Sequence, residues 1–351
     1  IEGCKFYGYR ELAQNRWYVE AIQIDHAGTE GIQGALPYDN THCKHIMIKD
    51  CYFGKGRTYT FMKDGKEVTI EFESWPAAIG GHTHKEDHWH ENIMIINNTF
   101  DRMRYFAVRP YKWLNTLVTG NVFYECGGGI YAVSGSEHQN FGAAQPFKRL
   151  SILDNQFIDG QQIYPEHFQG NRRFAIGIYS TAVVSEDVKI EGNIIQVTKD
   201  SGMIINNVSR VSIANNVIHD MERNGIEING CSNLLINQNH IQRISEYGMT
   251  LKNCDQITLS NNQIDQTEED AINIEQGTDL LVHQNMIHLD VDGKSGLVLA
   301  DETNTGIIRD NIIKGTYLHG LKIEETCYDL AYGYQIGTVQ NDSSHVEKIE
   351  D

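Results

Sequence analysis

The 351-residue sequence has only five prolines and no low-complexity linker, so nothing in it separates the chain into several domains. It has no apolar run approaching the roughly 18 residues of a membrane-spanning helix, which excludes membrane insertion by such a segment. Its seven cysteines are an odd number without Cys-x-x-Cys spacing, and so indicate neither a disulfide framework nor a zinc site. Basic residues are few, and the formal charge of −18 disfavours nucleic acid and anionic membranes as partners.

The chain instead contains a repeat in which asparagine recurs at a constant step of 23 residues. Each asparagine has an apolar residue two places after it, and others three and five places before it. Positions separated by two point to the same face of a strand, so each repeat predicts a strand that ends near its asparagine. A second alternating strand starts earlier in each repeat, as in Gly225-Ile-Glu-Ile. The repeating asparagines are Asn193, Asn216, Asn239, Asn262 and Asn285.

Short strands punctuated by Gly, Asn, Asp and Ser, without helical periodicity between them, predict an all-β fold: a right-handed parallel β-helix of about eleven coils. One coil cannot bury its own apolar face, and coils stacked roughly 4.8 Å apart bury it against one another. We interpret the asparagine column as an internal ladder at the bends, with each amide bonded to those above and below in a left-handed or bridging conformation. That role is structural, not catalytic.

The same pattern continues outside the regular region with wider spacing. Cys51, Asn98, Asn121 and Asn155 take the asparagine position, with steps of 47, 23, 34 and finally 38 residues to Asn193. Insertions within a coil form loops on one face of a solenoid, and such loops often carry sites. In one of these insertions, Asp64-Gly-Lys predicts a hairpin turn.

The sequence therefore predicts a single β-helix domain over residues 1–351. Loop-bearing coils with the site occupy 1–180, regular coils occupy 181–325, and a C-terminal cap or tail occupies 326–351. Because Ile1-Glu-Gly-Cys4 matches Ile190-Glu-Gly-Asn193, the chain is expected to begin inside a coil.

Superposing the first strand of every coil on Ala271-Ile-Asn-Ile-Glu275 gives one outward column of residues at the strand ends. Asp25, His82 and Arg109 are expected to be vertical neighbours in it, with about 10 Å between Asp25 and Arg109 at about 4.8 Å per coil. A carboxylate, an imidazole and a guanidinium in one groove would shift one another's pKa. The column continues through Ser134, where the register is open by one residue, and Tyr179.

The coil pattern resembles the pectate-lyase-like superfamily of right-handed β-helices over essentially the whole chain. Glu20-Ala-Ile-Gln-Ile-Asp25, Gly81-His-Thr and His90-Glu-Asn-Ile resemble segments of bacterial surface β-helix proteins of the streptococcal plasmin- and fibronectin-binding adhesin type, which implies a secreted or cell-surface protein. The order Asp25, Gly81-His82 and Arg109-x-x-Lys112 is also similar to the polygalacturonase family, where an Asp, a Gly-His-Gly and an Arg-Ile-Lys line the cleft. The paired Asp-Asp, the second Gly and the Ile of those motifs are absent here, so an identical inverting mechanism does not carry over.

Two classes of function follow: an enzyme that binds and cleaves a polysaccharide, and a non-catalytic surface adhesin or phage-type receptor-binding β-helix. For the enzyme, the sequence favours a glycoside hydrolase over a polysaccharide lyase that acts on a uronate-containing chain. Hydrolysis needs two carboxyl groups, which are Asp25 and one of Glu20, Glu91 or Glu137. Elimination needs a base and cationic groups for the uronate, available in His82, Tyr111, Lys112 and Arg109.

The predicted catalytic residues are Asp25, His82, Arg109 and Lys112. The residues predicted to bind the glycan are His26, His84, Tyr111, Trp113, Ser134, Glu137, His138 and Tyr179, and the rings of Tyr111 and Trp113 are expected to be exposed for stacking on sugars. No cofactor is predicted. The alternative is calcium or a transition metal at His82, His84, His88 and His90, whose spacing matches no helical or finger site.

Overall fold

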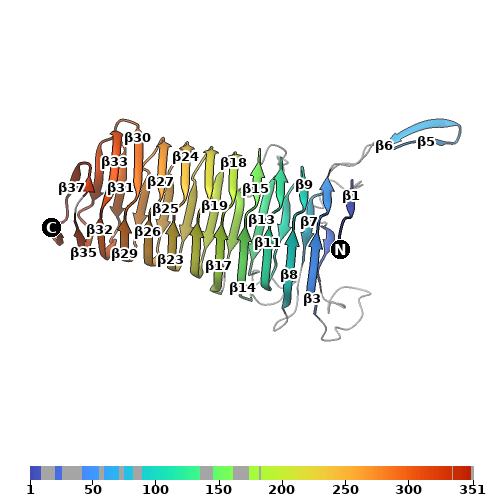
Figure 1. Ribbon diagram of the computed structural model, residues 1–351, viewed down its shortest axis with the longest axis horizontal. Coiled ribbons are helices and arrows are strands. Elements are labelled where there is room, and N and C mark those ends of the chain that lie inside the picture. The colour runs from blue at the N-terminus through green and yellow to red at the C-terminus, as the bar shows by residue number, and fades with distance from the viewer. Residues whose placement is uncertain are drawn as a thin grey trace.

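The computed structural model of the protein describes residues 1–8, 20–25, 42–54, 59–70, 75–81, 89–134, 145–160, 174–181, 183–333 and 335–348. These residues form strands and turns, and there is no helix among them. Successive strands belong to three sheets in a fixed order, and each strand pairs in parallel with the equivalent strand of the next coil (Figure 1). The protein is therefore a right-handed parallel β-helix, as the sequence predicted.

Three parallel sheets, each of twelve strands in the described residues, extend along the molecule. The first sheet contains β1 (Lys5–Tyr7), β4 (Tyr52–Gly54), β9 (Thr99–Asp101), β12 (Val122–Tyr124), β15 (Gln156–Ile158), β18 (Ile194–Thr198), β21 (Val217–Met221), β24 (His240–Ile244), β27 (Gln263–Thr267), β30 (Met286–Asp290), β33 (Asn311–Thr316) and β36 (Gln335–Ile336). The second sheet contains β2 (Glu20–Gln23), β7 (Ala77–Gly80), β10 (Phe106–Arg109), β13 (Gly128–Val133), β16 (Phe174–Tyr179), β19 (Ser201–Asn206), β22 (Ile226–Asn229), β25 (Met249–Lys252), β28 (Ile272–Glu275), β31 (Ser295–Ala300), β34 (His319–Ile323) and β37 (Val339–Asn341). The third sheet contains β3 (Lys44–Lys49), β8 (His90–Ile96), β11 (Trp113–Thr119), β14 (Lys148–Leu153), β17 (Ser185–Glu191), β20 (Val208–Ala214), β23 (Ser232–Asn237), β26 (Asp255–Ser260), β29 (Thr278–His283), β32 (Asn304–Arg309), β35 (Tyr328–Tyr332) and β38 (Val346–Lys348).

The asparagine ladder lies inside the bends between the third and first sheets, as predicted. In the regular coils the backbone N–H and the Nδ2 of each asparagine both donate to the Oδ1 of the next, at 2.9 to 3.1 Å. The ladder starts at Cys51, whose N–H donates to Oδ1 of Asn98, and ends at Asn311, whose N–H donates to Oε1 of Gln335. The ladder asparagines are at most 1% exposed, so these hydrogen bonds are made away from water.

The left-handed conformation expected of the ladder asparagines belongs instead to the residue before each one. The φ angles of Asn215, Gln238, Asn261 and Gln284 are 55°, 56°, 55° and 56°, whereas the asparagines that follow them have no positive φ. The preceding residue thus makes the bend, and this directs the next side chain into the interior. The ladder asparagine is selected for its hydrogen bonds, not for its backbone.

The apolar column two residues after the ladder forms the core beneath the first sheet. Phe53, Phe100, Phe123 and Phe157 stack in successive coils with ring centroids 5.2, 4.9 and 4.5 Å apart. Isoleucines continue the column in the regular coils, and all of these side chains are buried. The rings and aliphatic chains make one continuous core along the axis.

The predicted hairpin is formed by β5 (Tyr59–Lys63) and β6 (Lys66–Ile70), which pair antiparallel. Asp64 and Gly65 have φ angles of 53° and 73°, the pair of positive values that a tight two-residue turn requires. Figure 1 shows the hairpin standing away from the three sheets.

The C-terminal residues predicted as a cap or tail contribute β35 to β38 to the three sheets, up to Lys348. With twelve strands per sheet among the described residues, the solenoid has one coil more than the predicted number of about eleven. In the described part of the chain no helix has the length and apolar content to cross a membrane.

Candidate functional site

The register of the second sheet corrects the predicted column at Arg109. Arg109 pairs with Gly80, and Gly80 pairs with Gln23, so Arg109 is level with Gln23, two residues before Asp25. A shift of two residues leaves the inward and outward faces of a strand unchanged, so the alternation in the sequence could not detect it. Tyr111, which bridges to the next coil, takes the place predicted for Arg109.

Ser134 is one residue outside the column, because Val133 is the partner of Tyr179. The Ser134 side chain is buried, and its Oγ accepts a hydrogen bond from the N–H of Thr181 at 3.2 Å. The backbone oxygen of Ser134 accepts from the N–H of Gln145 at 2.9 Å. Ser134 therefore stabilises a turn, and its side chain does not contribute to the outer surface predicted to bind a glycan.

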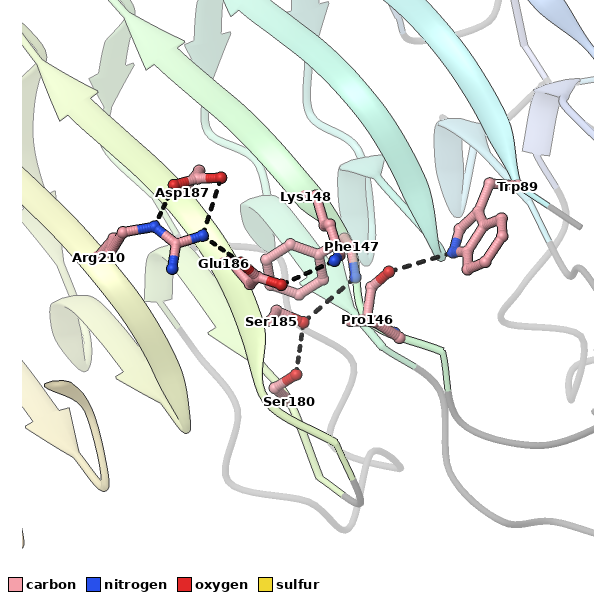
Figure 2. A network of polar contacts seen from close by, with 9 residues as sticks. All are labelled: Trp89, Pro146, Phe147, Lys148, Ser180, Ser185, Glu186, Asp187 and Arg210. Carbon is pink, nitrogen blue, oxygen red and sulfur yellow. Dashed lines mark hydrogen bonds and ion pairs between the residues drawn. The ribbon is translucent and has the colours of Figure 1, made fainter. Parts of the chain in front are cut away.

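A polar network holds the neighbouring turns in place, as Figure 2 shows. The hydroxyl oxygens of Ser180 and Ser185 are 2.6 Å apart, and Ser185 Oγ also accepts from the N–H of Phe147 at 3.2 Å. Trp89 Nε1 donates to the backbone oxygen of Pro146 at 3.2 Å. Ion pairs on the adjacent strands join Lys148 to Glu186, and Arg210 to Glu186 and Asp187. These contacts tie β14, β17 and β20 together.

Two carboxyl groups, an arginine and a tyrosine meet on the outer side of the second sheet. Glu20 begins β2 and Asp25 follows its end, and Oδ2 of Asp25 accepts a hydrogen bond from Nε2 of Gln23 at 2.8 Å. The Cζ of Arg109 lies 5.3 Å from the centroid of the Tyr111 ring. The charges of Arg109 and Asp25 both act on Glu20 and on Tyr111, which identifies the four as one electrostatic group.

The pKa of Glu20 is raised from 4.5 to about 7, chiefly by burial and to a smaller extent by the nearby Asp25. Arg109 and a backbone hydrogen bond act in the opposite direction, and the value of about 7 is the net result. The register explains this burial, because Glu20 is level with Ala77 and Phe106, and farther along with Phe174. Both phenylalanines are fully buried at that position. Glu20 thus places a carboxyl at a level where two of the later coils have a phenylalanine ring, and desolvation there favours the protonated form.

The aromatic residues beside this group form an apolar cluster separate from the main core. The ring of Phe106 lies 4.4 Å from Tyr131 and 5.2 Å from Phe174 between centroids, and Tyr131 lies 5.6 Å from Tyr179. Tyr131 alternates with main-core residues on β13, so the cluster lies on the outer side of the second sheet. It extends the surface around Glu20 along the helix axis, with Tyr179 partly exposed.

The expectation of exposed rings at positions 111 and 113 is wrong. Trp113 is 1% exposed and belongs to the main core, where it is paired with His90 of the preceding coil. Tyr111 is buried in the outer aromatic cluster, and burial raises the pKa of its phenol. Lys112 is fully buried, with its Nζ 5.3 Å from the centroid of the Tyr111 ring. Strand alternation predicts which side of the sheet a side chain points to, but it could not show that neighbouring coils cover these three side chains.

Of the three candidates for a second carboxylate, Glu20 is the one that the described residues place beside Asp25. Glu91 lies on β8 in the third sheet and forms an ion pair with Lys44, whose hydrogen bond lowers the pKa of Glu91. Glu137 lies outside the described residues, as do four other predicted site residues, His26, His82, His84 and His138. Their roles remain predictions.

The metal alternative rests on histidines of which the structure describes one. His90 is fully buried, and its Nδ1 accepts a hydrogen bond from the N–H of Cys43 at 3.1 Å. His82, His84 and His88 lie outside the described residues. Within the described ranges, no three His, Cys, Asp or Glu side chains are grouped so that they could hold a metal ion.

The raised pKa of Glu20 predicts a pH-dependent effect on stability. Between about pH 4.5 and pH 7 the folded protein keeps a proton on Glu20 that the unfolded chain releases, so the stability contribution of this group is present at low pH and falls as the pH rises. Relative to the Glu20→Gln variant, the parent is expected to lose up to about 3 kcal/mol of unfolding free energy across this range. Denaturant titrations of both proteins at several pH values measure it, and a constant difference from pH 4 to 8 would contradict it.

The fold and its repeated coils define the chain as a right-handed parallel β-helix. Residues 174–336 match a family model described as a right handed beta helix region.

One curated relative is the plasmin and fibronectin-binding protein A of Streptococcus pneumoniae (strain ATCC BAA-255 / R6). It is 29% identical over 205 residues, which are 57% of this chain and 24% of the relative. The match thus spans about a quarter of that protein's length. The resemblance to streptococcal surface β-helix proteins seen in the short motifs is confirmed.

Two solved structures are similar in fold. The structure of PfbA, a surface adhesin of Streptococcus pneumoniae, aligns with a TM-score of 0.58 and 12% identity, over 89% of this chain and 81% of that one. The A-module of the Azotobacter vinelandii mannuronan C-5 epimerase AlgE4 aligns over 93% of this chain and 88% of that one, at 13% identity. Its TM-score is 0.41.

Proposed function

We propose that the protein binds a polysaccharide over the outer side of β2, β7 and β10 and hydrolyses it, with Glu20 as the general acid and Asp25 as the second carboxylate. The observation that supports this most is the pKa of about 7 for Glu20, in the same group as Asp25 and Arg109. Glycoside hydrolysis uses one protonated and one ionised carboxyl group, and different surroundings separate the two roles. A desolvated Glu20 beside a hydrogen-bonded Asp25 meets that requirement.

In this mechanism Glu20 donates its proton to the glycosidic oxygen as the bond from that oxygen to the anomeric carbon breaks. Water supplies the hydroxyl group that the anomeric carbon gains, and the remaining proton of the water goes to a carboxylate. Asp25 either accepts that proton directly or first bonds to the anomeric carbon, according to the separation of the two carboxyl groups. Gln23 orients Asp25 through its hydrogen bond, and Arg109 supplies a positive charge for substrate oxygens.

Elimination, the lyase alternative, receives less support from the described residues. A lyase needs a base that gives up its proton readily at working pH. Burial raises the pKa of Tyr111, which makes the phenolate harder to form, and Lys112 is fully buried. We therefore place hydrolysis ahead of elimination.

Incubation with a panel of neutral and uronate-containing polysaccharides tests the proposal. New reducing ends without absorbance from unsaturated uronate would support hydrolysis, and new reducing ends with that absorbance would support elimination. We propose that cleavage needs no cofactor, so activity should survive a chelator. A loss that calcium or zinc restores would favour the metal alternative.

Replacing Arg109 with alanine is expected to weaken substrate binding, raising KM about tenfold, because a charged hydrogen-bond donor to the sugar is lost. A smaller change is expected in kcat if Arg109 acts mainly in binding. Initial rates over a range of substrate concentrations separate the two constants. Arg149→Ala, at an exposed arginine of the third sheet, is the control. Unchanged KM and kcat in Arg109→Ala would remove Arg109 from the site.

A non-catalytic surface adhesin is the second candidate, favoured by the similarity to a protein named for binding plasmin and fibronectin. On the same similarity we propose a secreted or cell-surface location. If this candidate is right, the protein cleaves no polysaccharide of the panel but retains glycans or host proteins in a binding assay, and Glu20→Gln leaves that binding unchanged.

A further inference from the structure

Gly80 has no side chain, and its backbone lies beside the proposed catalytic carboxyl group of Glu20. It pairs with Gln23 on one side and with Arg109 on the other. A Cβ atom added to Gly80 would lie 2.9 Å from Cγ and 2.9 Å from Oε1 of Glu20. The side chain of Glu20 therefore occupies the space over Gly80 that any other residue would fill.

The same arrangement recurs farther along the second sheet with an aromatic ring. Gly177 belongs to the row of Gly80, Arg109 and Tyr131, and a Cβ there would lie 2.0 Å from the ring of Phe174. Phe174 takes the position in its coil that Glu20 takes in the first. In both places an outward-facing glycine, Gly80 or Gly177, leaves space for the side chain of Glu20 or Phe174 to pack against the sheet.

The backbone does not explain the glycine at position 80, because Gly80 has no positive φ and any residue could adopt its conformation. Its backbone is held firmly, since β7 pairs with β2 and β10 and the oxygen of Gly80 accepts from the N–H of Ile24 at 2.7 Å. A side chain at position 80 would therefore displace the flexible Glu20 side chain and not the strand.

We propose that Gly80 is a positioning residue, whose lack of a side chain allows the Glu20 carboxyl to lie against the sheet between Gln23 and Arg109. Its effect on catalysis rests on the proposed function, but the position of the carboxyl does not. Among the described residues the charged groups that act on Glu20 are Arg109 of β10 and Asp25, and β7 contributes no titratable side chain. If the Glu20 side chain were displaced from Gly80, its carboxyl group would be exposed to water and its pKa would fall towards the ordinary glutamate value.

Carbon-13 NMR of protein labelled at the glutamate side chains measures this directly. The Glu20 signal is identified by its absence in Glu20→Gln and is expected to titrate near pH 7 in the parent. In Gly80→Ala its midpoint is expected to fall by about one pH unit or more. Gly333→Ala is the matched control, because a Cβ there meets only Cβ of Arg309 at an ordinary 3.5 Å. An unchanged Glu20 midpoint in folded Gly80→Ala would overturn the inference.

Two outcomes separate this inference from the proposed function. If the Glu20 midpoint falls in Gly80→Ala while the parent cleaves no polysaccharide, the positioning role stands and the hydrolase does not. If the parent cleaves and both the midpoint and the pH profile are the same in Gly80→Ala, the positioning role is wrong. Should Gly80→Ala fail to fold, Glu20→Asp shortens the side chain that covers Gly80 without touching β7. Its carboxyl, followed in protein labelled at the aspartate side chains, is expected to titrate near an ordinary aspartate. A midpoint still close to 7 would count against the proposal.

Discussion

Replacing Glu20 with glutamine is expected to lower the turnover of a cleaved polysaccharide by about a hundredfold or more, the effect of removing a positioned general acid. Glutamine keeps the shape of the side chain over Gly80 but cannot donate an acidic proton to the leaving oxygen. In the parent, activity is expected to fall as the pH rises through about 7, because Glu20 then loses its proton. Initial rates of reducing-end release across pH 5 to 9, with parent and variant, measure both effects.

Glu222→Gln is the matched control for this experiment, because Glu222 is an exposed glutamate of the regular coils. It should retain the parental rate and pH profile. A Glu20→Gln protein with parental turnover would show that Glu20 is not the acid. A falling limb in the pH profile that persists in Glu20→Gln would assign that limb to another group.

Asn239→Leu is expected to lower the unfolding free energy by about 3 kcal/mol or more, because it leaves several buried polar groups without partners at about 1 to 3 kcal/mol each. The N–H and Nδ2 of Asn216 would both lose the Asn239 Oδ1 that they reach at 3.1 and 2.9 Å. The backbone oxygen of Ile213 would lose the Nδ2 of Asn239 at 2.9 Å. Oδ1 of Asn262 would lose the same Nδ2 at 3.0 Å and keep only the backbone N–H of residue 239 as a donor. Denaturant-induced unfolding followed by circular dichroism measures the change.

Asn229→Leu is the control for the ladder, since it makes the same chemical change on the outer surface. Asn229 is exposed, and its Oδ1 accepts from Nδ2 of Asn253 at 3.0 Å at the surface. Water can replace that bond, so the expected change is within about 0.5 kcal/mol. Equal losses in the two variants would mean that the ladder has no special energetic role.

Local periodicity was enough to predict the β-helix, its ladder and the hairpin at Asp64 and Gly65. Each of these features depends on residues close in the sequence: an alternation of two for strands, a step of 23 residues for coils, and two turn residues with positive φ. The position of the left-handed residue was not predictable in this way, because the ladder asparagine and its predecessor are both polar residues at a bend.

The candidate site was predicted only in part. Asp25, Arg109 and Tyr111 do meet on one face, but Arg109 is level with Gln23 and not with Asp25. Nothing in the sequence favoured Glu20 over Glu91 as the second carboxylate, because Glu20 alternates with Ile22 and Ile24 as an inward residue would. The local sequence around Glu20 does not show that its side chain lies on the outer side of the sheet.

By itself the sequence determined the architecture, because short-range spacing specifies strands and stacking. Only the tertiary structure decided which ionisable groups act together. Pairing between coils sets the register at Arg109, and covering by neighbouring coils buries Trp113 and Lys112. The raised pKa of Glu20 depends on its desolvation against Gly80. The two residues are 60 positions apart in the sequence and become neighbours only because parallel pairing brings successive coils together.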